Sequence, residues 1–212
     1  MQTLTENALE KAERGIFTRE QAAFWVGGSG ARLDALLKRA IGAGEVWRIH
    51  RGLYCLSDRY RKERINPFEL AQRIQGPSYI SLETALSFHG WIPEAVHAVT
   101  SATLGRSRTF DTPVGVFSFT RIPQRLLFAG VRRDSADGKG AFLMATPLKA
   151  LADYVYAHRC DWHSVTPVYE DLRVDEESLA GLSPDAFDET VPAYKSGRVS
   201  RFLEGLRKDL NL

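Results

Sequence analysis

Apolar residues between positions 31 and 44 follow the spacing of a helix with one buried face. They recur at intervals of three and four residues, so they gather on a single stripe. The residues of this stripe are Leu33, Leu36, Leu37, Ala40 and Ile41. A turn of about 100° per residue places four residues on the opposite face, three of them basic: Arg32, Ala35, Lys38 and Arg39. We predict a helix with Ser29 as its N-cap, ended by Gly42 and Gly44.

Two shorter helical patterns precede this basic helix. The first ends near Gly15, and its apolar residues are Leu4, Ala8, Leu9 and Ala12. The second begins at Thr18, because Thr18 and Gln21 have the spacing of a capping box, in which each side chain bonds the other residue's backbone N–H. Its apolar residues are Ala22, Ala23, Phe24 and Trp25. The glycine-rich segment 27–30 then leads into the basic helix.

Residues 46–56 have the alternating pattern of two short strands. Arg51-Gly52 is the predicted turn, since glycine adopts positive φ without strain. One face is expected to pack against the protein, through Trp47, Ile49, Leu53 and Cys55. The other face is expected to be polar, with Arg48, His50 and Tyr54.

Three helices followed by a basic hairpin form the outline of a winged helix-turn-helix, which predicts double-stranded DNA as the partner. Four residues of the basic helix are expected to contact the DNA: Ser29, Arg32, Lys38 and Arg39. Three residues of the hairpin are expected to reach phosphates or the minor groove: Arg48, His50 and Arg51. The alternative is a protein-binding helical module whose charges face solvent.

The distribution of charge favours DNA over that alternative. The whole chain has a net charge of only +2. Residues 1–65 contain 12 Lys and Arg against 8 Asp and Glu, which gives +4, whereas residues 150–212 contain 7 against 12, which gives −5. A first domain with this excess can neutralise several phosphates.

A second domain is expected after the charged segment 57–64. We predict a winged domain at 1–58, a linker at 59–65, and an α+β domain at 66–212 with a helical, acidic C-terminal tail. Its helices are expected from Asn66-Pro67, over Ser81–Gly90, over Thr146–His158 and over Arg198–Leu210. Its mostly antiparallel sheet is expected from strands at about 97–103, 107–111, 114–120, 127–133 and 141–145, with turns at Asp111-Thr112-Pro113 and Asp137-Gly138.

Composition narrows the class of protein further. The chain is 44% hydrophobic and 25% charged, which is typical of a globular protein. Its apolar runs are too short for a membrane span, and its polar start differs from a signal peptide. We therefore expect a cytoplasmic protein without membrane contact. Cys55 and Cys160 are expected to be reduced thiols, because they fall in different predicted domains.

The motifs of common enzymes are missing from the sequence. It has no phosphate-binding loop, no GxSxG elbow and no HExxH pair. One group of four possible metal ligands stands out: His158, Cys160, Asp161 and His163. Its spacing matches no common zinc pattern, and a helix C-terminus also explains it, so we predict no metal and no cofactor. Glu83 and His89 share no helix face, and we predict a protein that is not an enzyme.

Four segments resemble those of a known family. The most specific is Tyr79-Ile80-Ser81-Leu82-Glu83-Thr84-Ala85-Leu86-Ser87-Phe88-His89-Gly90-Trp91. The others are the hairpin at residues 44–54, Val99-Thr100 with the basic strand that follows, and the helix segment at residues 145–153. In order and spacing, over about residues 4–155, they resemble the AbiEi-type antitoxins of type IV toxin–antitoxin systems, which act in phage abortive infection.

The resemblance implies a division of labour between the two domains. The winged helix would repress its own operon by binding promoter inverted repeats, as a monomer or as a dimer that pairs on DNA. The second domain would counter a nucleotidyltransferase toxin without a need for a stable complex. A basic surface is the best candidate for this antitoxicity or for a second nucleic-acid contact: Arg106, Arg108, Arg132 and Arg133. The alternative is that these arginines are simply the solvated face of a sheet.

Two other functions stay open at the level of sequence. The first is a winged-helix transcription factor whose second domain binds a small ligand or a protein. The second is a DNA-processing enzyme with a winged-helix targeting domain, and the absence of a cluster of acidic metal ligands ranks it lower.

Overall fold

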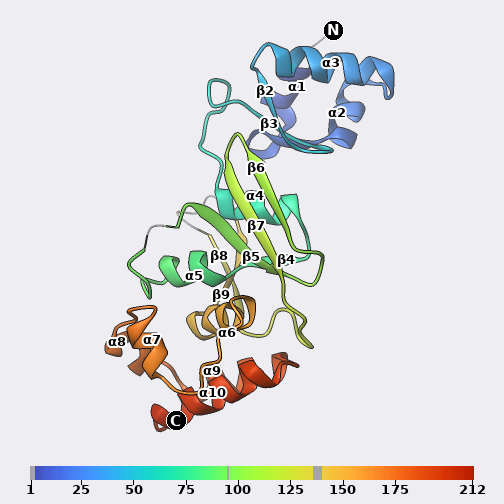
Figure 1. The fold of residues 1–212 in the computed structure, drawn as a ribbon. Coiled ribbons are helices and arrows are strands. Elements are labelled where there is room, and N and C mark those ends of the chain that lie inside the picture. Colours follow the sequence, from blue (N-terminus) through green and yellow to red (C-terminus); the bar gives the residue numbers. More distant parts are fainter. Residues whose placement is uncertain (1–2, 95, 136–139) are drawn as a thin grey trace. The chain divides into compact units, whose positions relative to one another are not determined.

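The computed structural model describes residues 3–94, 96–135 and 140–212 (Figure 1). The fold class is α+β, as the sequence predicts. The chain divides into two compact units. The first contains the chain up to Pro67 together with Phe110–Gly115, and the second contains Phe68–Thr109 and Val116–Leu212. The predicted turn at Asp137-Gly138 lies outside the described residues.

The first unit contains three α-helices, a short 3-10 turn and three strands. In chain order they are α1 (Leu4–Lys11), η1 (Glu13–Gly15), β1 (Ile16–Thr18), α2 (Arg19–Val26), α3 (Ala31–Gly42), β2 (Val46–His50) and β3 (Leu53–Leu56). The predicted capping box of Thr18 and Gln21 is confirmed, and Thr3 with Glu6 forms a second one at the start of α1. Such caps satisfy backbone N–H groups that a helix leaves unpaired in its first turn. The first helix ends at Lys11, earlier than predicted.

The sheet of the first unit has the order β1-β3-β2, and both pairings are antiparallel. Strand β1 was not predicted, since three residues show no period. Because β3 is the central strand, all four of its residues are buried. The prediction that Tyr54 lies on a polar face is therefore wrong. Its ring is only 6% exposed and stacks on Phe17 of β1, with ring centroids 5.7 Å apart.

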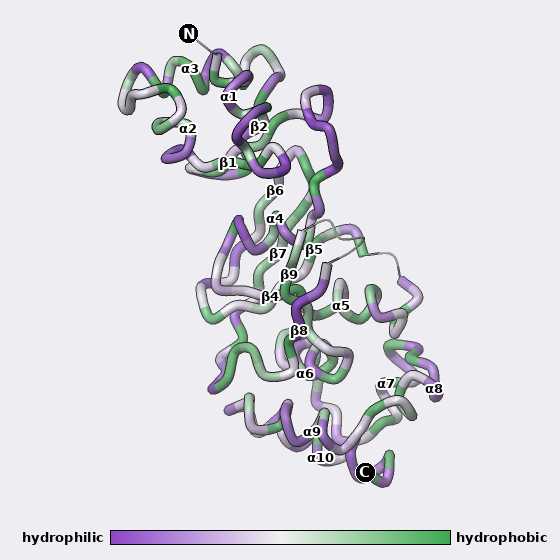
Figure 2. The backbone as a smooth tube through the Cα atoms, turned by 180° about the vertical axis from the view of Figure 1, so that it is seen from behind, coloured by the Kyte–Doolittle hydropathy of each residue, from purple (hydrophilic) through white to green (hydrophobic). Residues whose placement is uncertain are grey.

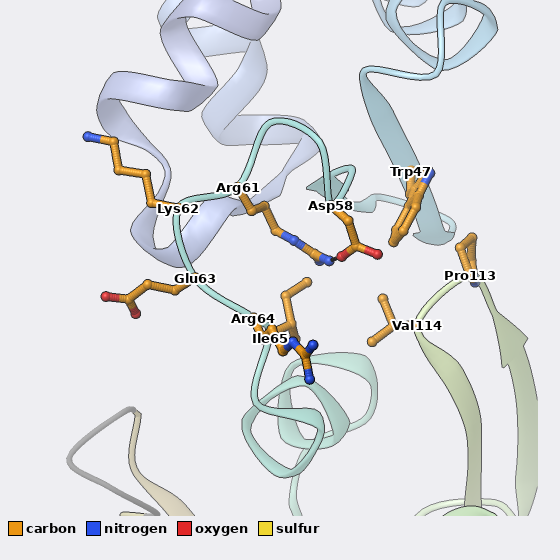
Figure 3. A pocket seen from close by; sticks show the side chains of 9 residues that line it. All are labelled: Trp47, Asp58, Arg61, Lys62, Glu63, Arg64, Ile65, Pro113 and Val114. Carbon is orange, nitrogen blue, oxygen red and sulfur yellow. Dashed lines mark ion pairs between the residues drawn. The ribbon is translucent and has the colours of Figure 1, made fainter.

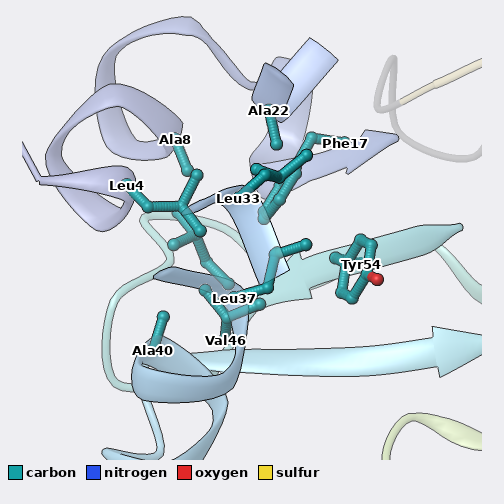
Figure 4. Close-up of a cluster of buried hydrophobic side chains, with 10 residues drawn as sticks. Leu4, Ala8, Phe17, Ala22, Leu33, Leu37, Ala40, Val46 and Tyr54 are labelled. Carbon is teal, nitrogen blue, oxygen red and sulfur yellow. The ribbon is translucent and has the colours of Figure 1, made fainter. Parts of the chain in front are cut away.

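One apolar cluster holds the helices of the first unit against this sheet (Figure 4). It consists of Leu4, Ala8, Phe17, Ala22, Leu33, Leu37, Ala40, Val46, Tyr54 and Leu56. Burial of each large aliphatic or aromatic side chain contributes roughly 1.5–3 kcal/mol relative to exposure. The predicted stripe of α3 supplies three members of the cluster, and Leu36 packs against it. Ile41 is exposed instead, because it lies at the edge of the stripe in the last turn.

The start of α3 and the exposed side of α2 differ from the prediction. The N-cap of α3 is Gly30, with φ +69°, and not Ser29, so no side chain caps this helix. Gly30 reaches a backbone region that L-residues avoid, which is why the chain turns there. Phe24 of α2 is 85% exposed, and Leu9 of α1 is 42% exposed. Neither side chain therefore lies in the core, although the apolar character of both residues predicts burial.

The second unit is built on a six-stranded sheet with the order β6-β7-β5-β4-β9-β8, of which only the connected ends of β6 and β7, at Phe110–Gly115, belong to the first unit. Its strands are β4 (Ser78–Ile80), β5 (Ala98–Thr103), β6 (Arg108–Thr112), β7 (Gly115–Arg121), β8 (Val131–Asp134) and β9 (Phe142–Ala145). The sheet is mixed, because β4 pairs antiparallel with β5 and β8 with β9, whereas β5–β7 and β4–β9 are parallel. Strand β4, which lies between β5 and β9, is missing from the sequence prediction.

The strand predicted at 127–133 begins only at Val131. The preceding residues form a turn that ends at Gly130, whose φ is +71°. The Gly130 N–H donates to the Glu189 carboxylate, and its carbonyl accepts from Thr146 N–H, so its backbone groups bond outside any strand ladder. Tertiary contacts therefore decide this strand boundary.

Eight helical segments accompany the sheet among the described residues. They are α4 (Pro67–Ile74), α5 (Leu82–Phe88), α6 (Pro147–Ala157), α7 (Thr166–Glu170), α8 (Glu176–Ala180), α9 (Pro184–Thr190), η3 (Val191–Ala193) and α10 (Gly197–Asp209). Helix α6 contacts α5, α9 and α10, which makes it the central helix of this unit (Figure 1). The predicted helices at 81–90, 146–158 and 198–210 correspond to α5, α6 and α10.

Over the part of the chain that the structure describes, no helix combines the length and apolar character that a membrane crossing requires. Cys55 and Cys160 are both free thiols. Cys55 is fully buried on β3, and burial raises the pKa of its thiol to about 11.

Candidate nucleic-acid interface

The exposed side of α3 carries the cations that the sequence assigned to DNA. Arg32, Lys38 and Arg39 are all exposed, while Leu33 and Leu37 between them are buried. This separation follows from the helical period, because positions 33, 37 and 40 turn toward the sheet. Ser29 is exposed as well and lies just before the first turn of α3. Helix α3 has 12 residues, so it is roughly 18 Å long.

The β2–β3 hairpin presents two further arginines. Arg48 and Arg51 are exposed, and Gly52 in the turn has φ +88°. The backbone N–H of Arg19 donates to the Gly52 carbonyl at 2.9 Å, which ties the start of α2 to this turn. The turn is therefore held beside the start of α2, and Arg51 projects from a backbone that this hydrogen bond supports.

His50 differs from the other residues assigned to the hairpin contact. Its ring lies against that of Phe110, with centroids 5.7 Å apart. The Nε2 atom of His50 is buried and has no hydrogen-bond partner among the described residues. The pairing register of β2 with β3 shifts between Arg48 and His50, which breaks the alternation that placed both side chains on one face. The structure thus separates His50 from the two exposed arginines.

A pocket of about 660 Å³ lies between α2, α3 and the hairpin turn of the first unit. Its lining residues are Arg19, Glu20, Asp34, Arg48, Arg51, Gly52 and Tyr54. Arg19 Nη1 donates to Asp34 Oδ1 in an ion pair that joins α2 to α3. This hydrogen bond lowers the pKa of Asp34 and raises the pKa of Arg19. Sequence reasoning missed Arg19, because only the tertiary fold brings the start of α2 beside the hairpin.

A second pocket of the first unit, of about 500 Å³, is lined by Trp47 of β2, by residues of the segment after β3, and by Pro113 and Val114 (Figure 3). The guanidinium of Arg61 stacks over the Trp47 ring at 5.2 Å and forms an ion pair with Asp58. The Arg61 side chain is only 5% exposed, and Ser57 Oγ donates to the Gly44 carbonyl at 2.7 Å. These contacts bind the segment after β3 to the sheet, although the segment is largely hydrophilic (purple in Figure 2).

In the second unit, the four arginines assigned to a basic surface are separated. Arg108 is on β6, Arg106 lies shortly before it, and Arg132 and Arg133 are on β8. Strands β6 and β8 are the two edges of the sheet, five strand spacings or roughly 24 Å apart. The structure therefore does not gather these arginines on one surface.

Arg132 already has a partner within its own unit. Its guanidinium donates to both carboxylate oxygens of Glu189, at 2.8 and 2.5 Å. These bonds, together with the Gly130 N–H, lower the pKa of Glu189 to about 2. The pair joins β8 to α9, so an incoming anion would have to compete with Glu189 for Arg132.

The residues considered as metal ligands follow α6 and point to separate partners. His158 Nε2 lies 2.7 Å from Glu83 Oε1 on α5, and His163 Nε2 lies 3.4 Å from Asp161. The hydrogen bond with Glu83 raises the pKa of His158. Across the described residues, no group of three or more His, Cys, Asp and Glu side chains is arranged to hold a metal ion.

The second unit also encloses a buried polar network that no sequence pattern revealed. Lys149 and Asp153 of α6 are both 0% exposed. Asp153 accepts hydrogen bonds from Tyr79 OH at 2.7 Å, Ser81 Oγ at 2.7 Å, Tyr194 OH at 2.5 Å and Gln124 Nε2 at 3.1 Å. Lys149 Nζ donates to Gln124 Oε1 at 2.5 Å. Burial lowers the pKa of Lys149 and raises those of Tyr79 and Tyr194. The network is closed to solvent, so it supports the fold and offers no binding site.

Comparisons of the chain with protein families and with curated proteins add nothing to what the interface indicates about function. No protein-family model matches the chain, and no curated protein matches it either.

Proposed function

We propose that the first unit is a winged helix-turn-helix that binds double-stranded DNA, and that the protein represses transcription from its own promoter. The β2–β3 hairpin is the wing in this proposal, and α3 is the recognition helix. The observation that carries the proposal is that three cations of α3 (Arg32, Lys38 and Arg39) and two arginines of the hairpin (Arg48 and Arg51) are all exposed. Helix, turn and wing all belong to one compact unit.

The physical case rests on shape and charge together. The major groove of B-DNA is about 12 Å wide and accepts one α-helix with its side chains. Arg32, Lys38 and Arg39 can then contact bases or phosphates, and Arg48 and Arg51 can contact the flanking backbone. Arginine binds guanine and phosphate through two parallel hydrogen bonds, which makes it the most specific of these contacts.

For the second unit we propose the role of an antitoxin against a nucleotidyltransferase toxin, without catalysis of its own. This part rests on the resemblance of segments 44–54, 79–91 and 145–153 to the AbiEi-type antitoxins. Segments 79–91 and 145–153 include α5 and parts of β4, β9 and α6. The two segments contain four residues of the buried network: Tyr79, Ser81, Lys149 and Asp153. In these two segments, the resemblance thus concerns residues that build the second unit.

The first experiment measures fluorescence anisotropy of a labelled duplex from immediately upstream of the gene, against a shuffled duplex, over a series of salt concentrations. We expect tighter binding to the upstream duplex that persists at moderate salt. Arg39→Ala and Arg32→Ala should each weaken this binding by about 1–3 kcal/mol where the arginine contacts guanine. Arg201→Ala, an exposed arginine on α10, is the matched control and should change nothing.

Equal binding of both duplexes, lost as salt rises, would contradict specific repression. Unchanged affinity in both α3 variants would contradict α3 as the recognition helix. The antitoxin role is tested separately by co-expression with a nucleotidyltransferase encoded beside this gene. We expect the Arg39→Ala variant to bind the operator more weakly yet still prevent growth arrest, because the two roles are assigned to different units.

A further inference from the structure

The pocket between α2, α3 and the hairpin turn contains three arginines from three different elements. Arg19 comes from the first residue of α2, Arg48 from β2 and Arg51 from the hairpin turn. Two carboxylates share the pocket, those of Glu20 and Asp34. Of these, Asp34 is bound to Arg19, with side chains 60% and 35% exposed. The pair is thus open to solvent and to a competing anion.

Arg19 is held in place by backbone bonds as well as by Asp34. Its N–H donates to the Gly52 carbonyl, and Thr18 before it forms the capping box of α2. The backbone that carries the Arg19 guanidinium is consequently fixed before a ligand binds. Binding therefore costs less conformational entropy than it would for an arginine on a mobile segment. Tyr54, which lines the same pocket, raises the pKa of Arg19 further through its hydroxyl.

A carboxylate and a phosphodiester offer a guanidinium the same pair of anionic oxygens. Asp34 therefore occupies the position at Arg19 that a DNA phosphate would take. We propose that this pocket is a phosphate-binding site, that Arg19 is its central ligand, and that Asp34 is an internal competitor which must give up Arg19 when DNA binds. The proposal rests on the DNA-binding function proposed above and adds a ligand and a regulator to it.

The competitor has a physical consequence for binding to random DNA. Every duplex carries phosphates, so a permanently free Arg19 would strengthen binding to all sequences alike. Asp34 reduces that common contribution, while contacts from Arg32 or Arg39 to bases are unaffected. Asp34 should thus lower the affinities for operator and random duplexes by the same factor, which limits binding to random DNA without changing the ratio of the two affinities.

The test compares Asp34→Asn, Arg19→Gln and the double variant with the wild-type protein on operator and shuffled duplexes. Asp34→Asn should bind both duplexes more tightly, and its log affinity should fall more steeply with log salt by about 0.9, which is one additional phosphate contact. Between 50 and 200 mM salt this is a roughly 3.5-fold larger loss of affinity. The gain should vanish in the double variant. Glu20→Gln is the matched control, since it removes the same charge from the same pocket without breaking the pair.

Three results would overturn the proposal. An equal gain in Glu20→Gln would mean that net charge alone acts. A gain that survives in the double variant would exclude Arg19 as the ligand. Weaker binding of Asp34→Asn to the operator alone would mean that Asp34 reads a base, as a carboxylate can do at cytosine.

A second readout separates this proposal from the proposed function. Titration with inorganic pyrophosphate is followed through the Nε–Hε resonance of Arg19 by NMR. We expect this resonance to shift in Asp34→Asn at a lower pyrophosphate concentration than in the wild-type protein. If no variant binds DNA but the shift occurs, the phosphate site stands and the DNA-binding function fails. If DNA binds but Arg19 does not respond, the phosphate site fails alone.

Discussion

Each unit of this protein contains one prominent group of charged side chains, and the two groups lie in opposite environments. In the first, Arg32, Lys38 and Arg39 of α3 are exposed, and the pair of Arg19 and Asp34 is open to solvent. In the second, Lys149 and Asp153 are completely enclosed in a hydrogen-bonded network. Exposed ion pairs contribute little to stability and can exchange partners, whereas enclosed charges depend on every bond they make. The charges of the first unit are therefore suited to ligand binding, and those of the enclosed network to structural support.

The largest expected effect comes from the enclosed carboxylate. Asp153→Asn replaces an acceptor-only group with one that donates, so it mismatches the hydroxyls of Tyr79 and Tyr194 and removes a negative charge that acts on Lys149. We expect the free energy of unfolding to fall by about 3–5 kcal/mol, measured by urea denaturation. Asp34→Asn is the matched control and should leave the urea midpoint unchanged. A small effect at Asp153 would contradict the distinction between the units.

The second largest expected effect on stability comes from Gly205 of α10, where another segment of backbone passes close to the helix. Glycines in the connection before α3, such as Gly27 and Gly30, have open space around the position of a Cβ. In the second unit, a Cβ at Gly205 of α10 would overlap the carbonyl of His163 and lie 2.7 Å from its carbon. Gly205→Ala should therefore cost about 1–3 kcal/mol, because backbone atoms must move.

The control for this prediction is Gly197→Ala on the same helix. A Cβ at Gly197 meets no described atom within 4 Å, and alanine favours the helix. We expect its thermal midpoint to be unchanged or higher than that of the wild-type protein. Equal loss in both variants would mean that the approach of α10 to residue 163 is not tight.

The smallest expected effect concerns the half-buried pair of His158 and Glu83. The hydrogen bond with Glu83 raises the pKa of His158. Burial of Glu83 opposes its ionisation, yet the bonds from His158 and from its own backbone outweigh burial, so its pKa is lowered. A raised histidine pKa stabilises the fold at pH below about 6.5 and loses this effect as pH rises through the folded-state pKa. The lowered pKa of Glu83 stabilises the fold above about pH 4.5, and this stabilisation is lost as pH falls through the folded-state pKa.

The pair should therefore stabilise the second unit most between about pH 4.5 and 6.5. In the wild-type protein, the pair should make the unfolding free energy differ between pH 6 and pH 8. His158→Gln should reduce this difference by about 0.5 kcal/mol or less, since both side chains are partly solvated. The measurement is urea denaturation at a series of pH values. An unaltered pH profile in the variant would show that the pair carries no ionic stabilisation.

Features that depend on neighbours in the chain could be read from the amino-acid sequence. The helical period separated Leu33 and Leu37 from the cations of α3, and the spacing of Thr18 and Gln21 fixed the start of α2. The positive φ of Gly52 and most strands of the second unit follow from equally local preferences. These features are readable because each is set within one or two turns of chain.

Features that depend on distant partners emerged only from the three-dimensional fold. Strands β1 and β4 have three residues each, too few to show a period, and are defined by the strands they pair with. Tyr54 is buried because β3 lies between two strands, and the arginines of β6 and β8 are separated by the order of the sheet. The pair of Arg19 with Asp34 and the network around Asp153 join residues far apart in sequence. Periodicity reports which side of an element is buried, whereas packing decides which other element covers it.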